Sequence, residues 1–172
     1  MFSKKSIASA LLLAGSMSLP LATQAAQPGF YVGGSLGQGQ DVVLDQTSAA
    51  YKIFGGFNIN RFLGMEVAYV NLGSNYTDSY GDSFTQDGGS FDFVGYLPIG
   101  PYLDLFGKVG IYNWTVSSNY YYASSHGSNN DYGFGIDAQV APRVWVRGEY
   151  QKFKDVAGGD VNLASVGISY HF

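Results

Sequence analysis

The sequence predicts an all-β protein, an eight-stranded antiparallel up-and-down β-barrel that spans a membrane. Of the 172 residues, 46% are hydrophobic and only 13% are charged, and the chain holds 24 glycines, 14 tyrosines and 12 phenylalanines. Beyond the N-terminal segment, no run approaches the ~18 consecutive apolar residues that a membrane-spanning helix needs. Apolar residues instead alternate with small or polar ones, which is the period of a strand with one buried face.

The first 26 residues have the three parts of a secretory signal peptide. Lys4 and Lys5 give a basic start, an apolar run follows over residues 7–15, and Ala25 and Ala26 are small residues suited to cleavage. We therefore expect residues 1–26 to be removed on export and residues 27–172 to form the folded domain.

The first four expected strands lie within residues 30–97. Within each strand the apolar residues named below share one parity, and the other parity holds mostly small, polar or charged residues. The bulky positions are Phe30, Val32 and Leu36; Tyr51, Ile53, Phe57 and Ile59; Met65, Val67 and Tyr69; Phe91, Phe93 and Leu97.

The last four expected strands lie within residues 103–172 and repeat the pattern. Their bulky positions are Leu103, Leu105, Val109 and Ile111; Tyr132, Phe134, Ile136 and Val140; Val144, Val146 and Tyr150; Val166, Ile168, Tyr170 and Phe172. A soluble β-sandwich, the alternative, would cover its second face with Lys, Glu and Thr. Here that face carries mainly Gly, Ala and Ser with a few charges, which suits a narrow interior.

The connections between these strands alternate between short and long. The short ones lie near residues 60–63, 98–101 and 141–143 and contain Asn, Gly or Pro. The longer ones are rich in Gly, Ser, Asn and Asp, and we expect them to be four extracellular loops, at about residues 38–48, 73–89, 116–130 and 153–160. Short turns at one end and long polar loops at the other are typical of outer-membrane barrels.

Charged residues on the inward parity predict a network of ion pairs in the lumen. Eight strands enclose a space just wide enough for side chains, and a lone buried charge is very costly, so these charges must pair. The expected network consists of Glu66, Asp92, Asp104, Lys108, Asp137, Arg147 and Glu149, and Lys52 has the same parity.

Two turns predict which charges of this network face each other. A symmetric turn at Pro142 places Asp137 directly opposite Arg147, and a turn centred near Gly100 places Asp92 opposite Lys108. Direct cross-strand neighbours have Cβ atoms about 4.5–5.5 Å apart, which is close enough for a salt bridge.

On the outward parity, four aromatic residues are expected to lie at the membrane interfaces as a girdle: Tyr69, Tyr150, Tyr170 and Phe172. Phe172 also ends a strand with apolar residues at alternate positions. That ending resembles the C-terminal strand that the barrel-assembly machinery recognises, so this machinery is an expected partner.

Several segments resemble the transmembrane domain of the OmpA family. They are residues 54–60 with Gly64, Met65, Glu66 and Tyr69; residues 103–110 with Trp114; Pro142 with residues 147–151; and residues 165–172. The resemblance implies a small outer-membrane barrel in which a cluster of inward salt bridges plugs or gates the lumen. Glu66, Asp137 and Arg147 occupy matching positions, whereas Val94 replaces a gate lysine of the family.

His126, Gly127 and Ser128, followed by Asn129, resemble the active site of outer-membrane lipid A deacylases. A histidine base beside a serine nucleophile is suitable chemistry. However, the pair is expected in a long loop, with no obvious acidic third member, so His126 and Ser128 are weak catalytic candidates and we expect no enzyme activity.

Other site classes have little support in the composition. The chain has no cysteine and two histidines, His126 and His171, which are expected at opposite ends of the barrel, so we expect no metal site and no cofactor. Without the two lysines of the first segment, seven basic residues face 13 acidic ones. An acidic chain without a basic patch argues against nucleic-acid binding.

The sequence therefore predicts a non-enzymatic, monomeric barrel in the outer membrane of a Gram-negative cell that contributes to envelope integrity. Its expected partners are membrane lipid, lipopolysaccharide and an extracellular ligand of the loops, which would make it a surface-recognition or adhesion protein. The alternatives are a narrow or gated pore for ions and small solutes and, with less support, a lipid A deacylase.

Overall fold

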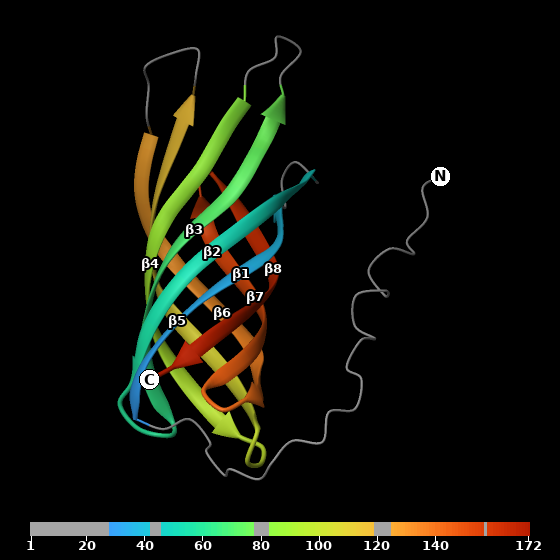
Figure 1. Cartoon of the computed structure of the whole chain (residues 1–172). Helices are drawn as coiled ribbons and strands as arrows, with labels where there is room; N and C mark the ends of the chain where they lie inside the picture. The colour runs from blue at the N-terminus through green and yellow to red at the C-terminus, as the bar shows by residue number, and fades with distance from the viewer. Residues whose placement is uncertain (1–27, 42–45, 78–82, 119–124, 157) are drawn as a thin grey trace.

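The computed structural model describes residues 28–41, 46–77, 83–118, 125–156 and 158–172, which form a closed barrel of eight antiparallel strands (Figure 1). The strands are β1 (Gly29–Asp41), β2 (Gln46–Asn58), β3 (Leu63–Thr77), β4 (Ser83–Pro98), β5 (Leu103–Ser118), β6 (Ser125–Ala141), β7 (Val144–Val156) and β8 (Gly159–His171). Each strand pairs with the next, and β8 pairs with β1, so the sheet has no open edge. The expected fold class is confirmed.

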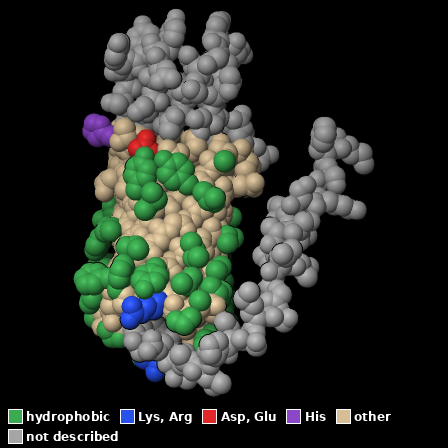
Figure 2. Space-filling model, viewed as in Figure 1, with side chains coloured by type: hydrophobic (Ala, Val, Ile, Leu, Met, Phe, Trp, Pro, Cys, Tyr) green, Lys and Arg blue, Asp and Glu red, His purple; other side chains and the backbone are tan. Residues whose placement is uncertain are grey.

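The alternation in the sequence decides which side chains enter the barrel. On β2, Lys52 and Phe54 are buried while Tyr51 and Ile53 are exposed. Large apolar side chains cover the outer wall, and Leu36 is 74% exposed. Figure 2 shows hydrophobic side chains spread over one face of the wall. An apolar surface of this extent requires an apolar surrounding rather than water.

Two inward glycines make room for large side chains in the narrow lumen. A Cβ atom on Gly56 would lie 2.3 Å from the ring of Tyr31, and one on Gly110 would lie 2.4 Å from Asp92 Oδ1. These separations are far below van der Waals contact, so the packing of the lumen depends on the missing side chains.

The strands are longer than the sequence pattern predicts. They extend into the expected loops 38–48, 73–89, 116–130 and 153–160. Only residues 42–45, 78–82, 119–124 and 157–158 remain between strands at the end of the barrel where these loops were expected. Backbone pairing needs no apolar side chains, so a strand continues after the apolar alternation has stopped. The expected loop boundaries are therefore corrected, and β6 already begins at Ser125.

The two predicted charge alignments have different outcomes. Asp137 lies directly across from Arg147, as predicted. Lys108 faces Val94 and not Asp92, because the β4–β5 turn is centred one residue later than expected, with Ile99 N donating to Leu103 O. That later centre shifts the pairing by two residues.

We call the end of the barrel with residues 59–62, 99–102 and 142–143 the short-turn end, and the opposite end the loop end. The C-terminus lies at the short-turn end, at the bottom of Figure 1. The expected signal peptide, residues 1–26, falls outside the described residues. Within the described ranges, no helix is long and apolar enough to cross a membrane.

Candidate functional site: the ionic layer of the lumen

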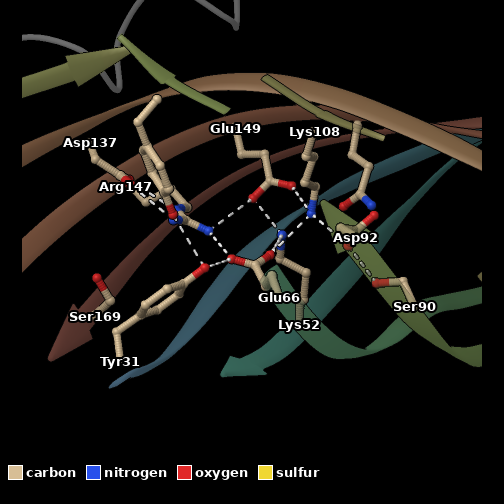
Figure 3. A network of polar contacts seen from close by, with 12 residues as sticks. Tyr31, Lys52, Glu66, Ser90, Asp92, Lys108, Asp137, Arg147, Glu149 and Ser169 are labelled. Atoms are coloured by element: carbon tan, nitrogen blue, oxygen red, sulfur yellow. Dashed lines mark hydrogen bonds and ion pairs between the residues drawn. The ribbon is translucent and has the colours of Figure 1, made fainter. Parts of the chain in front are cut away.

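Charged side chains from six strands meet in the middle of the barrel (Figure 3). They belong to Lys52, Glu66, Asp92, Lys108, Asp137, Arg147 and Glu149, and we call this set the ionic layer. All seven residues are at most 5% exposed. Each lies on the inward parity of its strand, so the period of the sequence placed them there.

Arg147 on β7 joins two carboxylates in this layer. Its Nε and Nη2 atoms donate to the two carboxylate oxygens of Asp137 at 2.9 Å each, and Nη1 donates to Glu66 Oε2. The guanidinium also lies over the rings of Phe106 and Phe54, 4.5 and 4.7 Å from their centroids. The two-point contact with Asp137 follows from the direct cross-strand pairing, and it fixes the plane of the guanidinium.

Lysines from two other strands complete the layer. Lys108 Nζ lies 2.7 Å from Glu149 Oε1, 3.2 Å from Glu66 Oε1 and 3.5 Å from Asp92 Oδ2. Lys52 Nζ pairs with Glu149 and lies 4.0 Å from Glu66 Oε1. Glu66 therefore contacts all three cations, and removing any one cation leaves its charge less compensated.

The structure brings together six of the seven predicted network residues in these pairs. The seventh, Asp104, is 2% exposed and lies across from Asp137 in the β5–β6 ladder. Lys52, which the sequence pattern also placed on the inward parity, joins these pairs through Glu149 and Glu66. The prediction missed Tyr31, whose hydroxyl donates to Glu66 Oε2 at 2.9 Å. Alternation alone cannot distinguish an inward tyrosine that makes such a hydrogen bond from one that only packs.

Apolar side chains fill the lumen on both sides of the ionic layer. Towards the loop end, buried residues include Val70, Leu72, Phe153, Val161 and Leu163, each at most 1% exposed.

Towards the short-turn end, Val94, Tyr96 and Phe106 form a second buried cluster. Near them His171 stacks on Tyr31, with ring centroids 5.1 Å apart. Among the described residues, packed apolar side chains therefore lie on both sides of the ionic layer.

The four residues of the expected aromatic girdle all lie on the outer wall. Tyr69, Tyr150, Tyr170 and Phe172 are 44%, 40%, 41% and 69% exposed. Tyr69 and Tyr150 lie near the middle of their strands, and Tyr170 and Phe172 lie at the short-turn end. All four are outward-facing, as the girdle prediction expects, and Tyr170 and Phe172 lie at the end of the barrel where one girdle is expected.

His126 and Ser128 lie on a strand and not in a loop, which corrects the expectation from the sequence. Both are on the exposed face of β6, where they pair with Thr115 and Asn113 of β5. Asp87 lies across Thr115 on β4, and it accepts a hydrogen bond from the Tyr69 hydroxyl at 3.2 Å. Thr115 thus separates the histidine from this carboxylate, because they are two strands apart.

Among the described residues, no group of three or more His, Cys, Asp and Glu side chains is placed to hold a metal ion.

Comparison with known proteins agrees with the barrel geometry. The family model for the outer membrane protein beta-barrel domain matches residues 9–172. Outer membrane protein A of Klebsiella pneumoniae is 29% identical over 166 residues, covering 84% of this chain and 46% of that protein. The chain thus spans about half the length of this relative.

Three solved structures share the fold. Neisserial surface protein A has a TM-score of 0.66 at 17% identity, covering 84% of this chain and 97% of that one. Ail, the attachment invasion locus protein of Yersinia pestis, solved with the heparin analogue sucrose octasulfate, has a TM-score of 0.59 at 14% identity, covering 86% and 100%. The N-terminal barrel of Pseudomonas aeruginosa OprF has a TM-score of 0.58 at 13% identity, covering 85% and 100%.

Proposed function

Because the chain belongs to the outer membrane protein beta-barrel domain family, we propose that it is a non-enzymatic, closed structural barrel of the Gram-negative outer membrane. In this proposal the barrel supports envelope integrity, and its loop end provides a surface for recognition or adhesion. The similarity to the OmpA family, expected from the sequence, is supported by the match to outer membrane protein A and by the shared fold.

The proposal rests on the packing of side chains that fills the described part of the lumen. The ionic layer lies between two groups of packed apolar side chains, and Glu66, Asp92 and Arg147 are at most 1% exposed. An ion crossing the barrel would have to separate buried pairs and also displace Leu72 or Phe153. Both steps are costly in a tightly packed interior.

A planar-bilayer recording of the refolded mature chain in KCl tests the closed lumen. We expect no discrete conductance steps from the unmodified protein. Arg147→Ala should also be silent, because the apolar groups on both sides of the layer remain in place. Conductance steps in the unmodified protein that change in Arg147→Ala would instead favour the alternative, a narrow pore gated by the ion pairs.

The recognition role is supported by the kind of protein that shares this fold. One of these proteins is an attachment invasion locus protein, solved with a heparin analogue. Variants that shorten the connections around residues 42–45, 78–82 and 119–124 should lower binding to host cells or anionic glycans while the barrel still folds. Unchanged binding in all of them would leave envelope integrity as the function.

Envelope integrity and the expected partners need separate tests. Deleting the gene should sensitise cells to detergent and EDTA, and Phe172→Ala should lower the amount of assembled barrel if the assembly machinery binds this end.

The weaker enzyme alternative predicts that cells with the protein contain shortened lipid A and that Ser128→Ala abolishes the change. Identical lipid A masses would remove that alternative.

A further inference from the structure

The outer wall carries an apolar groove that belongs to neither the ionic layer of the lumen nor the loop end. It has a volume of about 320 Å³ and runs between β1, β2 and β3. The outward residues that line it are Phe30, Val32, Gly55, Phe57, Met65 and Val67. We call it the Gly55 groove.

The cross-strand pairing explains why the groove exists. Val32, Gly55 and Val67 lie side by side on adjacent strands, so the middle position of this row has no side chain. In the next row towards the short-turn end, the Phe57 ring tilts against Phe30, with centroids 4.8 Å apart. The backbone at Gly55 therefore forms the floor of a depression with apolar walls.

The groove leads to a positively charged turn. Asn60 Oδ1 accepts hydrogen bonds from the N–H groups of Phe62 and Leu63 at 2.8 and 3.0 Å, which fixes the β2–β3 turn. Arg61 is exposed in this turn, and its Cζ lies 5.2 Å from the centroid of the Phe62 ring. At about 3.3 Å per residue, the strand from Gly55 to Asn58 spans about 10 Å.

No Asp or Glu side chain on the described part of the barrel balances Arg61. Among the described residues, no carboxylate pairs with it, and Asp104 and Asp137, which lie near the short-turn end, are buried in the lumen. On the face drawn in Figure 2, Lys or Arg side chains lie only towards the lower end and Asp or Glu only near the upper end.

From the groove and this unbalanced charge, we propose that the Gly55 groove and Arg61 form a binding site for one phospholipid of the periplasmic leaflet. One acyl chain lies in the groove, and the phosphate contacts the Arg61 guanidinium. Short turns of outer-membrane barrels face the periplasm, which places Arg61 at the headgroup level of that leaflet. Arginine binds phosphate oxygens through paired N–H donors.

A second copy of the barrel fits this surface less well. A symmetric dimer would bring the same wall against itself, so Arg61 would need a partner carboxylate at the same level. The described aspartates near this end are buried inside the barrel, which leaves the terminal carboxylate of Phe172 as the one exposed carboxylate described there. A phosphate supplies the missing negative charge, and its acyl chain matches the apolar walls.

Native mass spectrometry of the refolded chain with palmitoyl-oleoyl phosphatidylglycerol tests the site. We expect one retained lipid, and a loss of retention of about tenfold in Arg61→Gln, because a charge-assisted contact disappears. Gly55→Leu should cause a similar loss by filling the groove. A Cβ at this position meets its nearest atoms at 3.5 and 3.7 Å, which is ordinary contact, so the variant should fold.

Two matched variants serve as controls. Gly107→Leu adds the same side chain at another outward glycine, where the nearest atom to a Cβ lies 3.9 Å away. Arg143→Gln removes an exposed arginine from a different short turn. Both should retain the lipid as the unmodified chain does, and circular dichroism checks that all four variants are folded.

Photocrosslinking with a phosphatidylglycerol that carries a diazirine on its acyl chain locates the contact. Crosslinks concentrated on β1–β3 and lost in Gly55→Leu support the proposal. Crosslinks spread evenly around the wall would overturn it in favour of ordinary surrounding lipid. Retention of a second protein copy, or of lipid A in preference to the phospholipid, would also overturn it.

Discussion

The guanidinium of Arg147 joins Asp137 and Glu66 and lies against two aromatic rings, all inside the barrel. Keeping these ion pairs and removing one partner have unequal effects on the free energy of unfolding. Bringing these charges into the lumen costs desolvation free energy, which the pairing offsets only while every partner is present. Removing Arg147 should therefore lower the free energy of unfolding by more than its ion pairs contribute to it.

Arg147→Ala should lower the free energy of unfolding by roughly 3–5 kcal/mol, since it leaves Asp137 buried without its cation and Glu66 with one cation fewer. Urea unfolding of the barrel in lipid vesicles, followed by tryptophan fluorescence, measures this change. Arg143→Gln, on the exposed β6–β7 turn, is the control and should be close to neutral. An Arg147→Ala barrel as resistant to urea as the unmodified one would contradict the network.

At the scale of the strands, the β4–β5 pair shows how register and small residues work together. Asp92 pairs with Gly110, so its carboxylate lies over a position without a side chain and reaches Lys108 diagonally at 3.5 Å. A turn centred one residue earlier would have faced Asp92 with Lys108 directly. The ion pair forms in either register because the lysine side chain is long.

Gly110→Ala should destabilise the barrel by about 1–3 kcal/mol through overpacking. The added Cβ would lie 2.2 Å from Phe91 O and 2.4 Å from Asp92 Oδ1. Gly107→Ala, on the outward face of the same strand, has no atom closer than 3.9 Å and should have little effect. Equal unfolding midpoints for the two variants would contradict this account of the close approach.

At the scale of the whole molecule, the pairing of β8 with β1 closes the sheet around its inward side chains. The charges of six strands then meet in an interior where each of these residues is at most 5% exposed. A partly exposed pair at the loop end, Lys152 with Asp160 at 2.8 Å, shows the contrast, because it remains accessible to solvent.

Unfolding should depend only weakly on salt. Raising KCl from about 0.1 to 1 M shortens the Debye length from about 10 to 3 Å, which screens surface pairs but hardly reaches buried ones. We expect the free energy of unfolding to change by less than about 1 kcal/mol, the range of an exposed pair. Urea titrations at the two salt concentrations measure this, and a loss of several kcal/mol would mean that ions enter the lumen.

The sequence by itself determined the side of the sheet on which each residue lies. The two-residue period assigned Glu66, Lys108 and Arg147 to the interior, because successive side chains of a strand point to opposite faces. It also predicted the number of strands and the Asp137–Arg147 pair, since a tight turn fixes the register between neighbouring strands.

Only the tertiary structure decided which inward charges meet across the barrel. Glu66 on β3 contacts Arg147 on β7, and these strands are not neighbours in the sheet. Contacts of this kind depend on the tilt and stagger at which the barrel closes, which are properties of all eight strands together. The Gly55 groove likewise depends on three strands in register, because the sequence of one strand does not show which residues flank its glycine on the neighbouring strands.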